Sequence, residues 1–116
     1  MSHALIIDDN RVVGRAVQDH LSACGFESFD HVWTDRQALN AAERRKPDLI
    51  VVGDHIESDS PLELARQLAS RTDAAILAIT ADSYSFGRSL PEDAQIDGPH
   101  PLTELQEVIA SAGVTA

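Results

Sequence analysis

Two adjacent carboxylates, Asp8 and Asp9, directly follow the short apolar run at residues 4–7. A run of this length and composition is typical of a strand buried on both faces of a parallel sheet. In such sheets, ligands bind beyond the carboxyl ends of the strands. Two acids at one such end repel each other unless a cation or a partner charge offsets them. The pair therefore predicts a small cation site, such as a weak Mg²⁺ site, at this edge of the sheet.

The residues after the pair predict a helix, which gives the acids a second interpretation. Apolar side chains recur at helical spacing from Val12 to Cys24, and Gly25 is a typical residue to end a helix. Acids at the start of a helix stabilise its free N–H groups. The sequence does not decide between capping of this helix and cation binding.

Strand-like and helix-like segments alternate along the rest of the chain. The expected strands are residues 4–7, 27–33, 49–52, 74–79 and 94–96, and the expected helices are residues 11–24, 34–46, 61–69 and 102–112. Ser60, Pro61 and Glu63 have the pattern of a helix start. Residues 97–101 contain Gly98 and two prolines and predict a rigid turn.

Alternation of strands and helices requires right-handed crossovers, which give a parallel sheet covered on both faces. Five such strands fit the α/β class, with a doubly wound, flavodoxin-like sheet of order 2-1-3-4-5. The switch point of this order lies between the first and third strands. Asp8 and Asp9 are therefore expected beside the Gly53-Asp54 loop, since neighbouring strands lie ~5 Å apart.

Size and charge limit the classes of function. The 116 residues are expected to form a single domain, residues 1–116, because 43% of them are hydrophobic and the length suffices for one core. The formal net charge of −10 disfavours nucleic acid and anionic membranes as partners. A bilayer span needs about 20 apolar residues, and no run approaches this. With no secretory pattern at the N-terminus, a cytoplasmic location is expected, and the single cysteine, Cys24, is expected to pack in the core.

Several fragments, in this order and spacing, resemble the receiver domains of response regulators over nearly the whole chain. They are Ile6–Asn10, Pro47–Val52, Leu62–Leu64, Ile79–Ala81 and His100–Leu102. The resemblance implies phosphoryl transfer from a histidine kinase to an aspartate at the end of the third strand. It also implies that acids after the first strand hold Mg²⁺, that a hydroxyl follows the fourth strand, and that a lysine follows the fifth.

This chain matches only part of that pattern. Asp8, Asp9 and Thr80 stand at the family's acidic and hydroxyl positions, whereas Gly53 stands at the acceptor position and cannot be phosphorylated. Asp54 is the neighbouring candidate acceptor, but successive strand residues point to opposite faces, so a bulge would have to redirect its side chain. His100 stands at the lysine position, and Asp97 stands where the family often has an aromatic residue.

The family's partner surface includes its fourth helix, fifth strand and fifth helix. In this chain the segment between Thr80 and Ala94 is shortened and broken by Pro91, so an irregular or shortened fourth helix is expected. A contact patch is expected from Tyr84, Phe86, Leu90 and the final helix. The expected partners are proteins such as a histidine kinase, a phosphotransferase or an output protein of a phosphorelay.

The combined interpretation is a non-enzymatic, atypical receiver that acts through protein–protein interaction without aspartyl phosphate. One alternative is a divergent receiver that is phosphorylated on Asp54 with Mg²⁺. A second is a small cofactor-binding flavodoxin-like domain, which the lack of a glycine-rich phosphate loop after the first strand disfavours. The edge-strand residues Phe29 and Trp33 are expected to pack under the neighbouring helix, whereas an exposed Trp33 would mark a docking surface.

Overall fold

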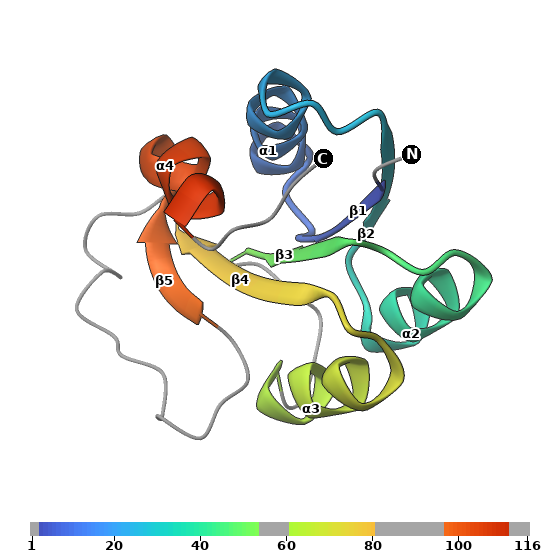
Figure 1. The fold of residues 1–116 in the computed structure, drawn as a ribbon. Helices are drawn as coiled ribbons and strands as arrows, with labels where there is room; N and C mark the ends of the chain where they lie inside the picture. Colours follow the sequence, from blue (N-terminus) through green and yellow to red (C-terminus); the bar gives the residue numbers. More distant parts are fainter. Residues whose placement is uncertain (1–2, 54–60, 81–96, 112–116) are drawn as a thin grey trace.

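The computed structural model describes residues 3–53, 61–80 and 97–111, which form one five-stranded parallel sheet with helices on both faces (Figure 1). The strands are β1 (His3–Ile7), β2 (Ser28–Val32), β3 (Leu49–Val52), β4 (Ala75–Thr80) and β5 (Asp97–Pro101). The helices are α1 (Arg11–Ala23), α2 (Asp35–Arg44), α3 (Pro61–Arg71) and α4 (Leu105–Ser111), with a short 3₁₀ segment, η2 (Leu102–Glu104), before α4. The strand order β2-β1-β3-β4-β5 confirms the predicted doubly wound, flavodoxin-like fold.

The core has two layers, one on each face of the sheet. Helices α1 and α4 cover one face, and α2 and α3 cover the other (Figure 1). Strands β1 and β3 are buried along their whole length, as their apolar runs predict. Alternate residues of β1 enter opposite layers, so that Ile6 packs towards α1 while Leu5 and Ile7 pack towards α2. The partly buried Cys24 packs against the α1 layer, which confirms its predicted role.

The buried face of helix α1 lacks one residue, Val12, that the apolar pattern of the sequence had placed in it. Val13 and Val17 are buried, but Val12 is 79% exposed. Each helical residue is rotated by about 100° from the one before it, so the side chains of Val12 and Val13 cannot both face the sheet directly. Gly25 follows the helix with a φ of 101°, a left-handed conformation that favours glycine.

Strand β5 corrects the predicted turn at residues 97–101. These residues pair in parallel with β4, with Leu77 opposite Asp97, Ile79 opposite His100 and Thr80 opposite Pro101, and with a register irregularity between Leu77 and Ile79. Pro99 and Pro101 lack a backbone N–H, but β5 is an edge strand, and there proline is tolerated. The predicted strand at 94–96, the shortened fourth helix, and the aromatic patch of Tyr84, Phe86 and Leu90 lie outside the described residues.

Candidate functional site

The carboxyl ends of β1 and β3 lie side by side, as the predicted strand order requires. Ile7 pairs with Val52, and the backbone N–H of Gly53 donates to the carbonyl of Ile7 at 2.9 Å. The next residue of β1, Asp8, donates its own N–H to the carbonyl of Val32 on the other side, also at 2.9 Å. Asp8 and Gly53 are therefore held next to each other by the ladders of three adjacent strands.

The Asp8 carboxylate is buried and directed inward, with only 1% of the residue exposed. Its Oδ1 accepts a hydrogen bond from the backbone N–H of Asn10 at 2.7 Å. Asn10 in turn caps α1, because its Oδ1 accepts from the N–H groups of Val12 and Val13 at 2.9 and 3.3 Å. The capping interpretation of the acidic pair is therefore corrected: Asn10 is the cap, Asp8 orients it, and Asp9 is exposed.

Gly53 leaves a space that the Asp8 side chain fills. A Cβ atom built on Gly53 would lie 1.8 Å from Asp8 Oδ2 and 2.7 Å from Asp8 Cγ. Both distances are far below the contact distance of non-bonded atoms, which is about 3.5 Å or more. The observed Asp8 conformation and any side chain at position 53 therefore exclude each other.

His31, which the sequence patterns did not indicate as a site residue, holds the backbone of Asp8 in place. The Nε2–H of His31 donates to the backbone carbonyl of Asp8 at 2.8 Å. The imidazole lies directly over Gly14 of α1, where an added Cβ would be 2.2 Å from His31 Cε1. The signal that could have indicated this contact is Gly14 inside a helical pattern, because glycine costs helix stability and is expected there only where close packing requires it.

The remaining sequence candidates are placed only in part. Thr80 ends β4 and His100 lies in β5, so the backbone positions of the family's hydroxyl and lysine reach the same end of the sheet as Asp8. Their side chains, and the whole of Asp54, lie outside the described part of the structure.

In the described residues, the carboxylates of Asp8 and Asp9 are the possible ligands for a divalent cation at this end of the sheet. Mg²⁺ prefers near-octahedral oxygen ligation by one or two carboxylates together with water or phosphate oxygens. Asp8 already uses Oδ1 for the Asn10 N–H and directs Oδ2 towards Gly53, which leaves the exposed Asp9 most accessible. Over residues 3–53, 61–80 and 97–111, no group of three or more His, Cys, Asp or Glu side chains is arranged to hold a metal ion.

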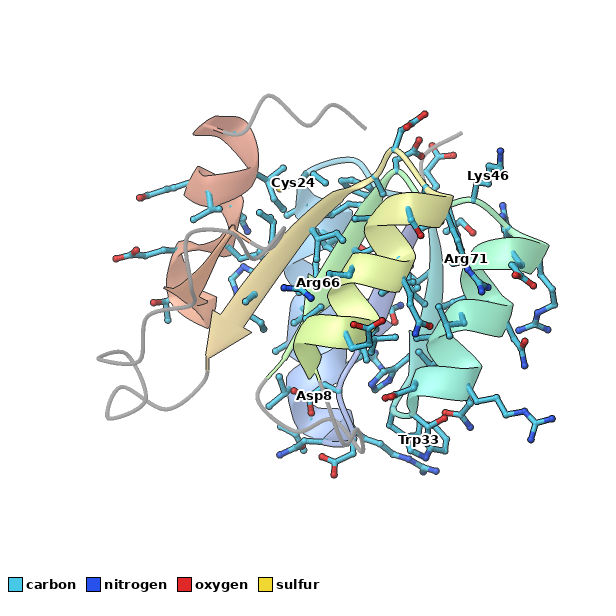
Figure 2. All side chains as sticks on the ribbon, turned by 90° about the horizontal axis from the view of Figure 1, so that it is seen from below. Asp8, Cys24, Trp33, Lys46, Arg66 and Arg71 are labelled. Carbon is cyan, nitrogen blue, oxygen red and sulfur yellow. The ribbon has the colours of Figure 1, made fainter. Side chains whose placement is uncertain are left out.

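Seen from below, Asp8 and Trp33 lie at one end of the molecule, whereas Cys24 and Lys46 lie at the other (Figure 2). Trp33 is 39% exposed, which corrects the expectation that it packs under the neighbouring helix, while Phe29 does pack against the α1 layer. None of the helices in the described ranges is long and apolar enough to cross a membrane.

Two curated proteins are similar to this chain in sequence. The KDP operon transcriptional regulatory protein KdpE of Escherichia coli strain K12 is 27% identical over 110 residues, which cover 91% of this chain and 48% of that protein. Protein-glutamate methylesterase/protein-glutamine glutaminase 3 of Hahella chejuensis is 29% identical over 83 residues, which cover 72% of this chain and 24% of that protein. The chain thus spans a quarter to a half of the length of these relatives. No protein-family model matches the chain.

Solved structures agree with the sequence relatives. A response regulator from Burkholderia pseudomallei, solved with a phosphorylated aspartic acid, a calcium ion and citrate, superposes with a TM-score of 0.73 at 26% identity, over 97% of this chain and 66% of that one. A CheY-like receiver domain from Methylobacillus flagellatus gives a TM-score of 0.72 at 20% identity, over 96% and 98% of the two chains. Strand order and these likenesses together show that the chain has the fold of a response-regulator receiver domain and is similar in sequence to response regulators.

Proposed function

We propose that this receiver domain has no phospho-acceptor at position 53 and signals through protein–protein contact without aspartyl phosphate. One observation carries the proposal: the Asp8 carboxylate occupies the space in which a side chain on Gly53 would begin. In this conformation position 53 has neither a nucleophile nor room for one.

The chemistry of phosphoryl transfer explains why this matters. The incoming phosphoryl group needs an attacking oxygen, and a cation that offsets the charge on its oxygens. Glycine supplies no oxygen. Asp8 and Asp9 would hold Mg²⁺ weakly, because one oxygen of Asp8 is bonded to the Asn10 N–H. A cation bound by these two acids would offset the negative charge of a phosphoryl group. Thr80 and His100, which stand at the family's hydroxyl and lysine positions, would contribute a hydroxyl and an imidazole to the site.

A phosphorylation-independent receiver has a precedent among proteins of this fold. An atypical orphan response regulator, for which a phosphorylation-independent regulatory mechanism has been described, superposes with a TM-score of 0.65 at 16% identity. At that identity the likeness concerns the fold alone. It supports the proposal only by making the mechanism compatible with this architecture.

The proposed partners are a histidine kinase, a phosphotransferase or an output protein. The residues proposed to contact them are those of α4, together with Tyr84, Phe86 and Leu90, which lie outside the described residues. Both curated relatives are longer than this chain. The proposed partners therefore include an output domain that lies on the same polypeptide as the receiver.

Phosphorylation of Asp54 is the alternative, and a specific observation favours it. The Burkholderia pseudomallei relative carries a phosphorylated aspartic acid and a calcium ion. Asp54 directly follows Gly53, and Asp8 and Asp9 would then hold Mg²⁺ beside it.

Treatment with acetyl phosphate and Mg²⁺, followed by intact-mass measurement, separates the two functions. We expect no phosphoryl adduct on the protein, under conditions in which a receiver with an ordinary acceptor is labelled in parallel. A phosphoryl adduct that is lost in Asp54→Asn and retained in the nearby control Asp59→Asn would overturn the proposal in favour of the alternative.

A further inference from the structure

The two edges of the sheet differ in how they are protected against a further strand. β2 and β5 are the outermost strands (Figure 1). An edge strand is a template for pairing with another chain unless proline, charge or a covering element blocks it. Pro99 and Pro101 remove two backbone donors from β5, whereas β2 contains no proline. Strand β2 is therefore the edge that accepts a further strand more readily.

The direction of the backbone along β2 decides which groups this edge presents. The N–H of Asp8 donates to the carbonyl of Val32 at 2.9 Å, so Val32 faces β1. Since backbone groups alternate in direction along a strand, the N–H and carbonyl groups of Phe29 and His31 face away from β1. These are the groups that a strand added to this edge would bond.

A groove of about 690 Å³ lies beside this edge, between β2 and α2. It is lined by His31, Val32, Trp33, Gln37, Asn40, Glu43 and Arg44. On the helix side, Glu43 and Arg44 carry opposite charges, and the two amides can both donate and accept hydrogen bonds. Such a wall favours neither an acidic nor a basic occupant, but it is complementary to a second copy of itself.

The distribution of charge along the chain favours this region as the place where two copies meet. Residues 28–46, which include β2 and α2, contain three acids and four bases. The rest of the chain contains sixteen acids and five bases. The formal charge is therefore +1 within residues 28–46 and −11 outside them. Contact through residues 28–46 avoids the repulsion between the acidic remainders of two copies.

We infer that two copies of this chain associate through the β2–α2 edge, with their β2 strands paired antiparallel about a two-fold axis. Two-fold contacts of this kind are the commonest ones in homo-oligomers. The two sheets then form one continuous sheet, and the α2 helices of the two copies lie side by side. This inference does not depend on whether position 53 or Asp54 accepts phosphate.

Side chains favour one register of the two β2 strands. An axis at Asp30, the centre of β2, sets two carboxylates directly opposite each other, which destabilises a strand pair. An axis one residue further along, at His31, places Phe29 opposite Trp33 of the partner subunit, and it does so twice. Cross-strand aromatic pairs stabilise sheets. This register also gives the 39% exposed Trp33 an apolar contact.

The same axis passes close to the middle of α2. His31 lies two residues before Trp33, which is about 6.6 Å along a strand. Helix α2 begins beside that end of β2, at Asp35, and needs four to five residues to cover the same length at about 1.5 Å per residue. Asn40, which is exposed and lines the groove, therefore lies at the level of the axis and faces its own copy.

Sedimentation velocity over about 10 µM to 1 mM protein tests the association itself. We expect a monomer–dimer equilibrium with a Kd below about 100 µM. A chain that stays monomeric up to about 1 mM would overturn the inference.

Substitutions at Asn40 test the location and the symmetry. Asn40→Glu and Asn40→Lys are both expected to weaken the dimer about tenfold, because either charge meets its own copy across the axis. Ser22→Glu and Ser22→Lys, at an exposed position of α1, are the matched controls and leave the dimer unchanged. Opposite effects of the two charges at position 40, or an equal loss in the Ser22 variants, would overturn the inference.

Amide hydrogen exchange tests the pairing of the strands. The N–H of His31 faces away from β1, so we expect it to exchange at least about tenfold more slowly at dimeric than at monomeric protein concentrations. The N–H of Asp30 faces β1, and its exchange serves as the control because it is bonded in both states. Association that leaves the exchange of the His31 amide unchanged would show that the copies meet elsewhere.

Discussion

At the amino end of β1, His3 is 3% exposed, and at the carboxyl end Asp8 is 1% exposed; these are the buried polar side chains among the described residues. His3 is fully engaged with neighbouring side chains. Its Nε2–H donates to Asp30 Oδ2 at 3.0 Å, and its Nδ1 lies 2.8 Å from the Ser28 hydroxyl. Its backbone N–H and carbonyl both pair with Asp48, at 2.9 and 2.8 Å.

Asp8 is held in a different way. Its carboxylate accepts from a backbone N–H, its carbonyl accepts from His31, and its Oδ2 lies where glycine provides space. The amino end thus resembles a completed structural network, in which several side chains satisfy one buried ring. On the proposed function, the carboxyl end is a binding site in which Gly53 stands at the acceptor position. The comparison indicates that the first end stabilises the fold and that the second retains the form of a functional site.

The largest expected effect is on the amino end. His3→Phe keeps a ring of similar size but removes the hydrogen bonds to Asp30 and Ser28. We expect the free energy of unfolding, measured by urea denaturation, to fall by about 3 kcal/mol. His20→Phe is the control, because among the contacts that the structure describes the His20 imidazole is bonded only to the exposed side chain of Gln106, at 3.1 Å. An equal effect of both substitutions would contradict the importance of the His3 network.

A second prediction tests the packing of the His31 imidazole against Gly14. The sign of the expected stability change depends on whether His31 is present. Gly14→Ala should gain up to about 1 kcal/mol from helix propensity. The clash of the new Cβ with His31 outweighs this gain, so we expect a net loss of about 1–2 kcal/mol. In a His31→Ala background the same substitution should stabilise the protein. Destabilisation of similar size in both backgrounds would show that the imidazole is not the obstacle.

A smaller effect is expected at the start of α2. Thr34 Oγ1 accepts from the N–H of Gln37 at 3.2 Å. Thr34→Ala should therefore cost about 1 kcal/mol, and Thr34→Ser should retain most of the stability because it keeps the capping oxygen. Thermal denaturation followed by circular dichroism measures both variants. If serine and alanine are equally destabilising, the loss has another cause than the cap.

The smallest effect is expected from the ion pair between α2 and α3. Arg71 and Glu43 are bonded, but both side chains are largely exposed. Solvent screens such pairs, so Arg71→Ala should change the free energy of unfolding by less than about 0.5 kcal/mol. A loss several times larger in urea denaturation would mean that this pair, rather than the buried layers, holds α2 against α3.

Local patterns in the sequence predicted most of the fold. The apolar runs predicted β1 and β3, the pattern at Ser60, Pro61 and Glu63 predicted the start of α3, and alternation predicted the strand order. Strand β5 was misplaced because its prolines favour a turn locally, whereas its pairing with β4 is a long-range contact. Such contacts override local propensity and have no short-range signature.

The site was predicted by position but not by conformation. Sequence order placed Asp8 beside Gly53, which the strand register bears out. Two features depend on contacts between residues that are far apart in sequence. They are the direction of the Asp8 carboxylate and the packing of the His31 imidazole against Gly14. A glycine within a helix was the one available signal for the latter.

A double-mutant cycle between positions 8 and 53 tests most directly whether the Asp8 side chain occupies the acceptor space. Gly53 has no left-handed φ that would make alanine unfavourable by itself. We predict that Gly53→Ala costs about 2 kcal/mol of unfolding free energy in the wild-type background, and less than about 0.5 kcal/mol when Asp8→Gly has removed the clash. An equal cost in both backgrounds would contradict the account, because the Asp8 side chain would then not be what excludes a side chain at position 53.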